Sequence, residues 1–428
     1  MRRRYKNSSI FLKRSEASIP LASQTFSKSK NQYPVGFSPL FIEKGKGGRV
    51  WDIDQNEYVD LVCGLLPVVL GYCDPDVDRA IKKQLSKGIT FSLPSKLETV
   101  LAEKLIEIIP SAEMVRFGKN GSDVTAAAIR LARAYTGKDH VVALGYHGWQ
   151  DWYISATTRN KGIPSDFEKY THRLPYNDKG VITAVFEEYV GNIAAVILEP
   201  MNIDCPMDGY LEFLRDICDK HKTVLVFDEI ITGFRYSLGG AQELFNVVPD
   251  LSCFGKAMGN GMPISAVVGK AEIMQEMQEI FFSGTFGGET LSIAASIAVI
   301  DKMQSKQVIE SLWQKGEFLS AGVNRLIKQF NLSNVVSLKG KSPWMILDFK
   351  DSGVWNSFEI KTLYIVEMLK NGVLSQGTHN VCYAHSQRDL DQVIMAYQST
   401  FSIIARAIQG SVKEYLPCQP IVPVFKIR

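Results

Sequence analysis

Val224-Leu225-Val226-Phe227-Asp228-Glu229 is an apolar run that ends in two acids. An uninterrupted run of this length is typical of a strand that is buried on both faces of a parallel sheet. In such sheets the groups that bind ligands gather at the carboxyl ends of the strands. We therefore expect Asp228 to stand at the edge of a sheet where a ligand binds.

Short apolar runs alternate with helical periodicity on both sides of this strand. The sequence predicts strands over 114–117, 141–144, 194–198 and 223–227, and helices over 76–86, 96–109, 123–135 and 209–221. Alternation of this kind predicts an α/β fold in which helices cover both faces of a mainly parallel sheet.

A lysine follows the strand in Phe254-Gly255-Lys256-Ala257-Met258-Gly259. Glycines let the backbone approach a planar ligand closely, and Phe and Met supply a partly desolvated pocket that favours a neutral amine. Enzymes that use pyridoxal 5′-phosphate need a Lys that forms a Schiff base and an Asp that keeps the pyridine nitrogen protonated. Asp228 and Lys256 therefore point to this cofactor.

Spacing alone also allows simpler roles for these two residues. Asp228 and Glu229 can cap the next helix, and Lys256 can be an ordinary solvated lysine. A magnesium site of the Walker-B type is excluded, because it requires a GxxxxGK[ST] loop. Gly45-Lys46-Gly47-Gly48 lacks both the spacing and the hydroxyl.

Two segments are candidates for binding a phosphate, which needs free N–H groups at a helix amino terminus. Lys119-Asn120-Gly121-Ser122-Asp123 leads into a strongly helical segment, although the same residues suit an ordinary N-cap. Ser283-Gly284-Thr285-Phe286-Gly287-Gly288 offers hydroxyls and glycine amides to the same phosphate.

An aromatic residue also follows a predicted strand, in Tyr146-His147-Gly148-Trp149 after the strand at 141–144. An aromatic ring at this position can stack on a pyridine, and core packing is the alternative.

Together these segments resemble the class III, fold type I, pyridoxal phosphate-dependent aminotransferases, most closely the glutamate-1-semialdehyde 2,1-aminomutase branch. The resemblance runs from about Pro39 to the C-terminal region. Its marks are Gly45-Lys46-Gly47 with Val50-Trp51-Asp52, Asn120-Gly121-Ser122-Asp123, Tyr146-His147-Gly148, Leu198-Glu199-Pro200, Phe227-Asp228-Glu229-Ile230-Ile231-Thr232-Gly233-Phe234-Arg235, Gly255-Lys256 and Gly284-Thr285-Phe286. It implies a large domain with a mainly parallel sheet of the seven-stranded type between helices. A small α+β domain is formed by the N- and C-terminal segments.

The resemblance also implies roles for residues at matching positions. Lys256 is the Schiff-base and proton-transfer lysine, Asp228 the partner of the pyridine nitrogen, and Glu199 lies near the substrate side of the cofactor. The cofactor-binding set is completed by Gly121 and Ser122 at the phosphate, Tyr146 stacked on the ring, His147 next to it in sequence, and Ile230 on the opposite face. Thr285 reaches the phosphate of the neighbouring subunit, which implies a homodimer with shared active sites.

The chain departs from the aminomutase branch in its lid and its arm. The stretch 146–178 is shorter where aminomutases carry a long flexible lid, and Trp149, Trp152 and Tyr153 stiffen it. The arm at 25–30 has lysines and no Arg for a substrate carboxylate. Intramolecular amino exchange must retain its intermediate, as a closing lid does, so the shorter lid favours simple transamination.

Candidate substrate contacts are Trp149, His379 and Asn380, and further ones are Lys28, Lys30 and Gln150. Surface exposure or structural packing is the alternative for each of them. Gly377-Thr378-His379-Asn380 stands where aminomutases place an acidic residue. This pattern resembles aminotransferases of surface polysaccharide and amino-sugar pathways, which implies a polar, sugar-derived aldehyde or ketone as acceptor.

The predicted domains follow from where the patterns change. A small meander is expected from Pro39 to Leu61, and a second α+β region contains a strand at 344–349 and a helix at 358–371. Residues 1 to about 38 are rich in Ser, Lys and Gln and suggest a loosely ordered arm that contains at most a short helix. We predict an arm with part of the small domain at 1–70, a large cofactor-binding domain at 71–310 and a C-terminal small domain at 311–428.

Composition limits the partners of this chain of 428 residues. The 48 basic and 45 acidic side chains give a net charge of +3, which favours neither nucleic acid nor an anionic membrane. Seven cysteines without a CxxC pair or a Cys/His metal spacing favour reduced thiols. No run approaches the roughly 18 apolar residues of a membrane span. We expect a cytoplasmic protein without a metal.

The sequence thus predicts an aminotransferase with a ping-pong mechanism. An amino acid donor gives its amino group to a carbonyl acceptor, of which a sugar-derived carbonyl is one candidate. One alternative is glutamate-1-semialdehyde 2,1-aminomutase, an isomerase. The other is a catalytically silent scaffold that keeps the fold for dimerisation or binding, against which the retained Lys256 and Asp228 argue.

Overall fold

The computed structural model describes residues 4–423, without the side chain of Lys413, and the chain forms two compact units. The central unit contains residues 66–68 and 75–309. The terminal unit contains residues 4–65, 69–74 and 310–423. Segments far apart in the sequence therefore build the terminal unit together.

A seven-stranded sheet forms the middle of the central unit, in the order β4-β10-β9-β8-β7-β5-β6. Only β10 runs antiparallel to its neighbours, so the predicted mainly parallel sheet is confirmed. The strands are β4 (Met114–Gly118), β5 (His140–Leu144), β6 (Thr171–Arg173), β7 (Ile193–Leu198), β8 (Val224–Asp228), β9 (Leu251–Phe254) and β10 (Ser265–Gly269).

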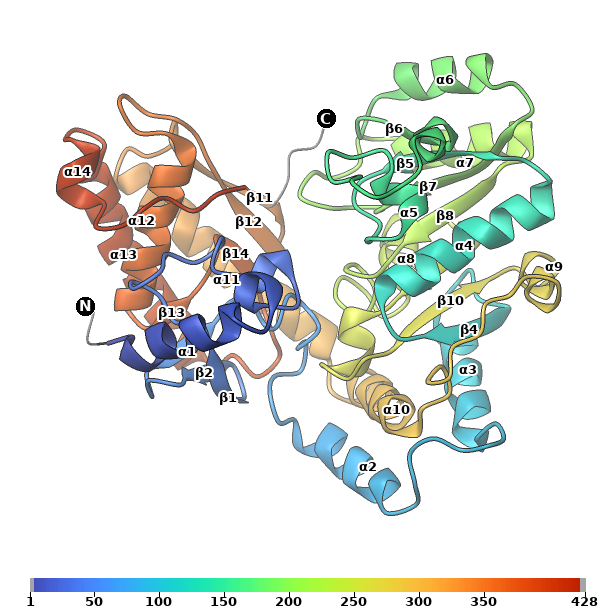
Figure 1. Ribbon diagram of the computed structural model, residues 1–428, viewed down its shortest axis with the longest axis horizontal. Helices are drawn as coiled ribbons and strands as arrows, with labels where there is room; N and C mark the ends of the chain where they lie inside the picture. Colours follow the sequence, from blue (N-terminus) through green and yellow to red (C-terminus); the bar gives the residue numbers. More distant parts are fainter. Residues whose placement is uncertain (1–3, 424–428) are drawn as a thin grey trace. The chain divides into compact units, whose positions relative to one another are not determined.

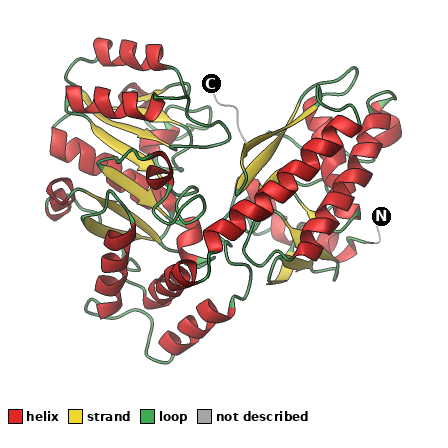
Figure 2. Cartoon of the chain, turned by 180° about the vertical axis from the view of Figure 1, so that it is seen from behind, coloured by secondary structure: helices red, strands yellow, loops and turns green. Residues whose placement is uncertain are grey.

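Helices cover both faces of this sheet, as Figures 1 and 2 show. The helices are α2 (Pro75–Leu85), α3 (Lys96–Ile108), α4 (Gly121–Thr136), α5 (Asp151–Ile154), α6 (Lys179–Glu188), α7 (Tyr210–His221), α8 (Ala241–Phe245), α9 (Ala271–Met274) and α10 (Thr290–Ser305). Three short 3-10 helices are η3 (Ser165–Tyr170), η4 (Lys256–Gly259) and η5 (Gln275–Gln278).

Strand β8 shows how the sequence fills the two faces of the sheet. Its side chains alternate, as the pleat requires. Val224 and Val226 pack into the cluster beneath α4, whereas Leu225 and Phe227 pack into the cluster beneath α6 and α7. The next residue in this alternation, Asp228, belongs to the α4 side.

The terminal unit contains two small sheets. One has the order β1-β2-β3-β13 and the other the order β11-β12-β14. The strands are β1 (Ile42–Lys46), β2 (Arg49–Asp52), β3 (Glu57–Asp60), β11 (Val336–Lys341), β12 (Trp344–Phe349), β13 (Val373–Leu374) and β14 (Thr378–Asn380). The helices are α1 (Lys6–Glu16), most of α11 (Val308–Gln329), α12 (Ser357–Lys370), α13 (Gln387–Ala407) and α14 (Val412–Tyr415), with short 3-10 helices η1 (Pro20–Ala22) and η2 (Phe26–Lys28).

The expectation of a loosely ordered arm is wrong for the described residues, whereas the short helix expected there is present as α1. Helix α1 begins where the carboxylate of Asp54 accepts hydrogen bonds from the backbone N–H groups of Asn7 (2.7 Å) and Ser8 (2.9 Å). Tyr5 is buried, and its ring lies beside Tyr58. The arm is held by one buried tyrosine and by the capping carboxylate of Asp54, which is distant in sequence. The polar composition of residues 1–38 gives no sign of these contacts.

The sequence analysis did not predict several elements of the central unit, among them β6, α6, β9, β10 and the long helix α10. Strand β9 is hard to recognise because Ser252 interrupts its apolar run. The Ser252 hydroxyl lies 2.9 Å from that of Ser111 and accepts a hydrogen bond from Gln242 Nε2 at 3.0 Å, so burying it leaves no unpaired polar group. Within residues 4–423, no helix combines the length and the apolar character needed to span a membrane.

Candidate active site

Three neighbouring strands deliver three charged side chains to one edge of the sheet. Glu199 follows β7, Asp228 ends β8, and Lys256 follows β9 after Gly255. Glu199 continues the alternation of Ala195 and Ile197, which also face the α4 side. Carboxyl ends of adjacent parallel strands form the usual ligand site of such sheets, so the site predicted from Asp228 and Lys256 is brought together in one place.

Asp228 is held rigidly. Its side chain is 5% exposed, and its Oδ2 lies 2.8 Å from Nδ1 of His147, with Nδ1–H as the donor. Oδ1 accepts a hydrogen bond from the backbone N–H of Ile230 at 3.2 Å. The ring of His147 is buried and stacks on Trp152, with 6.3 Å between the ring centroids. His147 therefore orients Asp228, a role that the sequence reasoning did not assign to it.

Glu229 does something different from its neighbour. It points away from Asp228 and accepts hydrogen bonds from the backbone N–H groups of Ala241 (2.7 Å) and Gln242 (2.9 Å), the first residues of α8. The hydroxyl of Thr232 donates to it as well. The capping alternative thus holds for Glu229, while Asp228 faces the site.

Lys256 sits in an unusual backbone position with φ of +40°. Burial lowers the pKa of its ammonium, while the charges of Asp228 and Glu199 act in the opposite direction. Arg235, which is buried and donates to the carbonyl of Leu66 at 2.9 Å, also disfavours the charged form. A lysine in these surroundings supplies a neutral amine more readily than a solvated lysine.

Glu199 closes the other side of the group. Burial, and then the charge of Asp228, raise the pKa of its carboxyl to about 7. Its Oε2 accepts a hydrogen bond from the backbone N–H of Tyr146 at 3.2 Å. The chain turns at Gly145 with φ of +115°, where a Cβ would lie 2.5 Å from Oε2 of Glu199. This turn therefore requires glycine.

The amino terminus of α4 lies at the same edge. Asn120 and Asp123 form a reciprocal capping box, which leaves the first-turn amides of Gly121 and Ser122 without helical acceptors. A Cβ on Gly121 would lie 3.2 Å from the side chain of Ile230. Ile230 therefore packs against the helix terminus, whose open first-turn amides are groups of the kind that can receive an anion.

Tyr146 presents an open ring. Its side chain is 51% exposed and meets Tyr153 edge-on at 5.8 Å between centroids. The Tyr153 hydroxyl donates to the carbonyl of Gly145 at 2.6 Å, which fixes the turn before Tyr146. Tyr146 therefore offers an exposed aromatic face to a planar ligand.

Thr285 lies in an exposed surface segment, 281–288, of the same unit. This segment borders a surface cavity of about 390 Å³ that is also lined by Lys119, Asp123 and Arg130. Trp149, a proposed substrate contact, is 65% exposed. Both residues are therefore open to a further molecule.

His379 and Asn380 lie in the terminal unit. The His379 ring is fully buried, its Nε2 lies 2.5 Å from the Tyr397 hydroxyl, and burial lowers its pKa to about 4. Asn380 is 2% exposed and donates through Nδ2 to the carbonyl of Val62 at 2.7 Å. These contacts support a structural role for both and give no support to the predicted contact with substrate.

Comparison with known proteins assigns the family. Fold type I transaminase structures share the architecture, and residues 31–387 match the family model described as aminotransferase class-III. The chain belongs to the class III aminotransferases, a family of enzymes that use pyridoxal 5′-phosphate.

Two relatives and one solved structure illustrate the similarity. The 3-aminobutyryl-CoA aminotransferase of Cloacimonas acidaminovorans is 36% identical over 87% of this chain and 91% of its own length. The glutamate-1-semialdehyde 2,1-aminomutase of Desulforamulus reducens is 35% identical over 87% and 92%. The FumI protein of Sphingopyxis sp. MTA144, solved in its PLP internal aldimine form, has a TM-score of 0.88 at 28% identity and covers 97% of this chain and 99% of its own.

The residues present suit this cofactor. A phosphate suits the free amides at the start of α4, a pyridine ring suits the exposed aromatic face of Tyr146, and its protonated nitrogen suits the buried Asp228 carboxylate. Lys256 is the nearby amine with a lowered pKa. The donor set therefore fits each part of the molecule.

Proposed function

We propose that this enzyme transfers an amino group from an amino acid donor to a carbonyl acceptor in two half-reactions. The bound cofactor supplies an electron sink that stabilises negative charge on the substrate carbon. Lys256 binds the cofactor covalently and, once released, moves the proton at that carbon through Nζ. The observation that carries this proposal is the grouping of Lys256, Asp228 and Glu199 at adjacent strand ends.

The remaining residues have positioning roles in this proposal. Asp228, held by His147, keeps a proton on the pyridine nitrogen, and Gly121 and Ser122 bind the phosphate. Tyr146 and Ile230 restrain the ring from opposite faces. Glu199 lies on the substrate side, where its carboxyl can take or return a proton near neutral pH because its pKa is about 7.

Simple transamination is favoured by the segment that follows Tyr146. The Thr171 hydroxyl donates to the carbonyl of Trp152 at 2.5 Å, and the Tyr153 hydroxyl donates to Gly145, so the segment is pinned at both ends. A pinned segment is a poor closing lid. The aminomutase remains the second candidate because several relatives of this chain carry that name at 34–36% identity.

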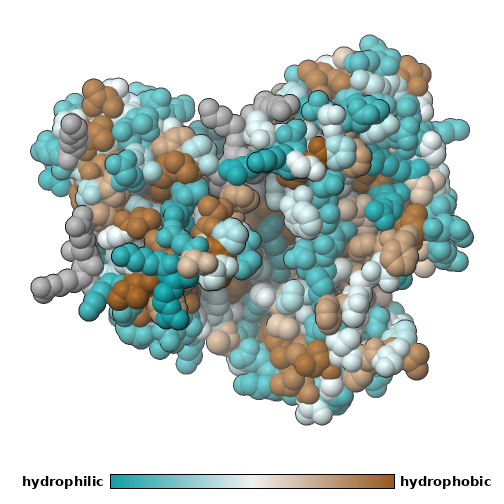
Figure 3. Space-filling view, in the orientation of Figure 1, coloured by the Kyte–Doolittle hydropathy of each residue, from teal (hydrophilic) through white to brown (hydrophobic). Residues whose placement is uncertain are grey.

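Homodimer formation is part of the proposal. Leu85, Ile89, Phe91 and Leu93 are exposed apolar side chains of the central unit, and Leu93 is 78% exposed. In Figure 3, hydrophobic residues gather over the region that Figure 1 labels α2. Such a patch is typical of an interaction surface, and we assign it to a second copy of this chain. Thr285 is proposed to reach the partner's phosphate site.

The test separates the candidate activities by their need for an acceptor. Supplied with an amino acid donor alone, the enzyme should convert about one equivalent per chain and stop, and a carbonyl acceptor should restart it. Continued turnover of glutamate-1-semialdehyde without any acceptor would instead identify the aminomutase. Glyoxylate and a hexose-derived ketone are suitable first acceptors, because the second tests the sugar-derived candidate directly.

Lys256 itself can be located chemically. Borohydride reduction of the holoenzyme followed by peptide mass mapping should find the cofactor on Lys256, and Lys256→Ala should retain the bound cofactor but lose at least about 10³-fold in turnover. A label on another lysine, or wild-type turnover in this variant, would end the proposal. Lys104→Ala is the matched control, because Lys104 is a lysine of the same unit that pairs with Asp301 at 2.7 Å and has no role in the proposed site.

A further inference from the structure

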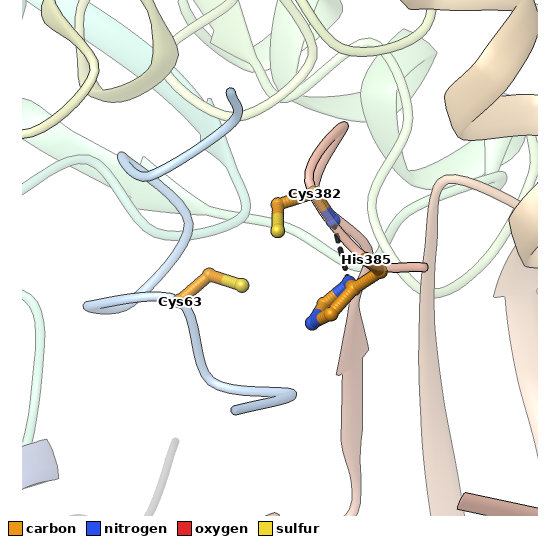
Figure 4. Close-up of side chains that lie close together, drawn as sticks. All are labelled: Cys63, Cys382 and His385. Atoms are coloured by element: carbon orange, nitrogen blue, oxygen red, sulfur yellow. Dashed lines mark hydrogen bonds between the residues drawn. The ribbon is translucent and has the colours of Figure 1, made fainter. Parts of the chain in front are cut away.

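The terminal unit contains a buried cluster of three side chains, Cys63, Cys382 and His385 (Figure 4). The two sulfur atoms and a ring nitrogen of His385 all lie within 4.8 Å of one another. Each of the three residues is at most 1% exposed, and both cysteines are free thiols. Two thiols that are far apart in the sequence are therefore brought together away from bulk solvent.

The two cysteines stand on segments that are hydrogen-bonded to each other. The backbone N–H of Asn380 donates to the carbonyl of Leu61 at 3.0 Å, and its Nδ2 donates to the carbonyl of Val62 at 2.7 Å. The Cys63 thiol donates to the carbonyl of Asn380 at 2.9 Å. The proximity of Cys63 and Cys382 is therefore a fixed property of the fold.

The Cys63 thiol has no strong bond to lose. Its sulfur lies near two carbonyl oxygens, that of Asn380 and, at 3.2 Å, that of Asp60. A thiol is a weak hydrogen-bond donor. Approach of the two sulfurs to the about 2.05 Å of an S–S bond therefore gives up only weak hydrogen bonds.

The surroundings of Cys382 favour its thiolate. Burial acts to raise the pKa of this thiol, but a hydrogen bond from Cys63 and interactions with His385 lower it well below its ordinary value. Lys315 donates to the carbonyl of Tyr383, and its positive charge is attracted by the Cys382 sulfur. The thiolate is the nucleophilic form of cysteine, so Cys382 is the attacking thiol and Cys63 its partner.

Two other buried cysteines of the chain lack this environment. Burial raises the pKa of the Cys218 thiol and of the Cys253 thiol. Both therefore remain protonated and inert, as is usual for buried cysteines. The comparison shows that burial alone does not give Cys382 its character.

A metal centre fits the cluster less well than thiol chemistry does. Nδ1 of His385 accepts a hydrogen bond from the backbone N–H of Cys382 at 3.0 Å. Nε2 therefore carries the ring proton, which it donates to the carbonyl of Asp60 at 3.1 Å. With both ring nitrogens engaged, two thiols remain, whereas a structural zinc site uses four ligands.

A cavity of about 450 Å³ gives a small molecule a route towards the pair. Its lining includes Asp60, Val62 and Gly64, the residues around Cys63 in the chain. Cys63 itself has φ of 46°, a left-handed conformation that is costly for a residue with a Cβ and is typical of functional positions. A molecule as small as a hydroperoxide in this cavity is separated from the sulfur by a single stretch of backbone.

We propose that Cys63 and Cys382 form a site of reversible oxidation whose substrate is a small hydroperoxide. With hydrogen peroxide, the Cys382 thiolate attacks one oxygen, an S–O bond forms, and the O–O bond breaks. The departing hydroxide takes up the proton that Cys382 released and leaves as water. Cys63 then attacks the Cys382 sulfur, the S–S bond forms, and the S–O bond breaks. The second oxygen leaves as water with the Cys63 proton, so two thiols lose two electrons and the peroxide gains them.

This oxidation is separate from amino transfer. Both cysteines belong to the terminal unit, whereas Lys256 belongs to the central unit. Disulfides of this kind are transient in reducing compartments, where thiol reductants return them to the free thiols. The cluster therefore adds a redox chemistry that the proposed function does not require.

The experiment maps the oxidised cysteines of the holoenzyme. After treatment with hydrogen peroxide, the remaining thiols are blocked with N-ethylmaleimide in denaturant, and the chain is digested without reduction. We expect a cross-linked pair of peptides that contains Cys63 and Cys382, lighter by two hydrogen atoms than the free peptides, and lost on treatment with dithiothreitol. Cys218→Ala is the matched control, because it removes a buried cysteine outside the cluster and should leave the cross-link intact.

Single variants test which thiol attacks. In Cys63→Ser, oxidation should stop at a sulfenic acid on Cys382, which dimedone labels. In Cys382→Ser, Cys63 should be labelled at least about tenfold less, because its thiol lacks the interactions that favour a thiolate. Oxidation should also raise the melting temperature of the wild type by at least about 2 °C, since the cross-link restricts the unfolded chain, and should not raise that of Cys63→Ser.

Three results would overturn the inference. The first is no Cys63–Cys382 cross-link under conditions that oxidise the exposed Cys73 and Cys205, which report that the oxidant has acted. The second is equal dimedone labelling in the two variants, which would contradict the roles assigned to the thiols. The third is tight binding of one Zn²⁺ per chain that both variants lose, which would assign the cluster to a metal instead.

Discussion

Asp228 and Glu229 are adjacent acids with different roles, because the alternation of side chains along the strand points them to opposite faces of the sheet. Asp228 faces the α4 side and is oriented by His147, while Glu229 is fully buried at the start of α8. Burial raises the pKa of Glu229 to about 7, although its hydrogen bonds act in the opposite direction. Glu229 is therefore a source of pH-dependent stability that lies outside the chemistry of the site.

The sign of this dependence follows from proton linkage. The folded chain holds the Glu229 proton up to about pH 7, whereas the unfolded chain loses it near 4.5. The contribution of Glu229 to the free energy of unfolding is thus complete below pH 4.5 and is lost as the pH rises through 7. Glu229→Gln should gain stability relative to the wild type between pH 5 and 8, by at most about 3 kcal/mol.

Denaturant unfolding of the holoenzyme and its Glu229→Gln variant at pH 5, 6, 7 and 8 measures this difference. The offset between the two proteins should change with pH in the stated direction. An offset that stays constant across the range would show that the Glu229 carboxyl does not titrate there.

At the scale of elements, the loop after β5 is fitted against the first turn of α4. Gly148 has φ of +102°, and a Cβ there would lie 2.5 Å from Cβ of Ser122. Gly148→Ala should displace the loop that carries Tyr146 and His147 from the helix terminus. We expect cofactor affinity to fall by at least about tenfold, because strain of 1–3 kcal/mol is typical of such a position.

Gly162→Ala is the control that separates the effect of the Gly148–Ser122 contact from the effect of backbone strain alone. Gly162 has φ of +93°, but nothing lies within 4 Å of its would-be Cβ. Cofactor affinity of both variants can be measured by titrating the apo forms with pyridoxal 5′-phosphate. Similar affinities in the two variants would contradict a special fit between Gly148 and Ser122.

The same elements show what a sequence can and cannot reveal. Strand β8 can be predicted from the sequence because its apolar run is continuous. Asp228 is conspicuous as the acid that ends this run, and Lys256 as a lysine between glycines. Strand β9 cannot be predicted in this way, because the hydroxyl of Ser252 interrupts the apolar run and its hydrogen-bond partners come from distant segments. His379 attracts attention as an isolated polar residue, yet its partner is Tyr397 in the buried core. In both β9 and His379 the structure depends on contacts between residues that are far apart in the sequence. The periodicity of the sequence gives no information about such contacts.

At the scale of the whole molecule, the open question is whether one chain completes another's site. Thr285 is exposed in the segment 281–288, where no described contact explains its hydroxyl. If it binds the partner's phosphate, Thr285→Val should weaken cofactor binding by about tenfold through loss of a hydrogen bond to an anion. A role within its own chain would give the same loss, so the single variant does not decide the question.

Dimers of two different variants can show whether Thr285 serves its own chain or the partner chain. In a twofold dimer of Lys256→Ala and Thr285→Val chains, one site would carry both lesions and the other would carry neither. Unfolding and refolding the two variants together should then restore about a quarter of wild-type activity at limiting cofactor, since half of randomly paired dimers are mixed and each has one intact site. Mixing without subunit exchange is the control. If Thr285 serves its own chain, each mixed dimer has two damaged sites, and activity should not exceed the average of the parents.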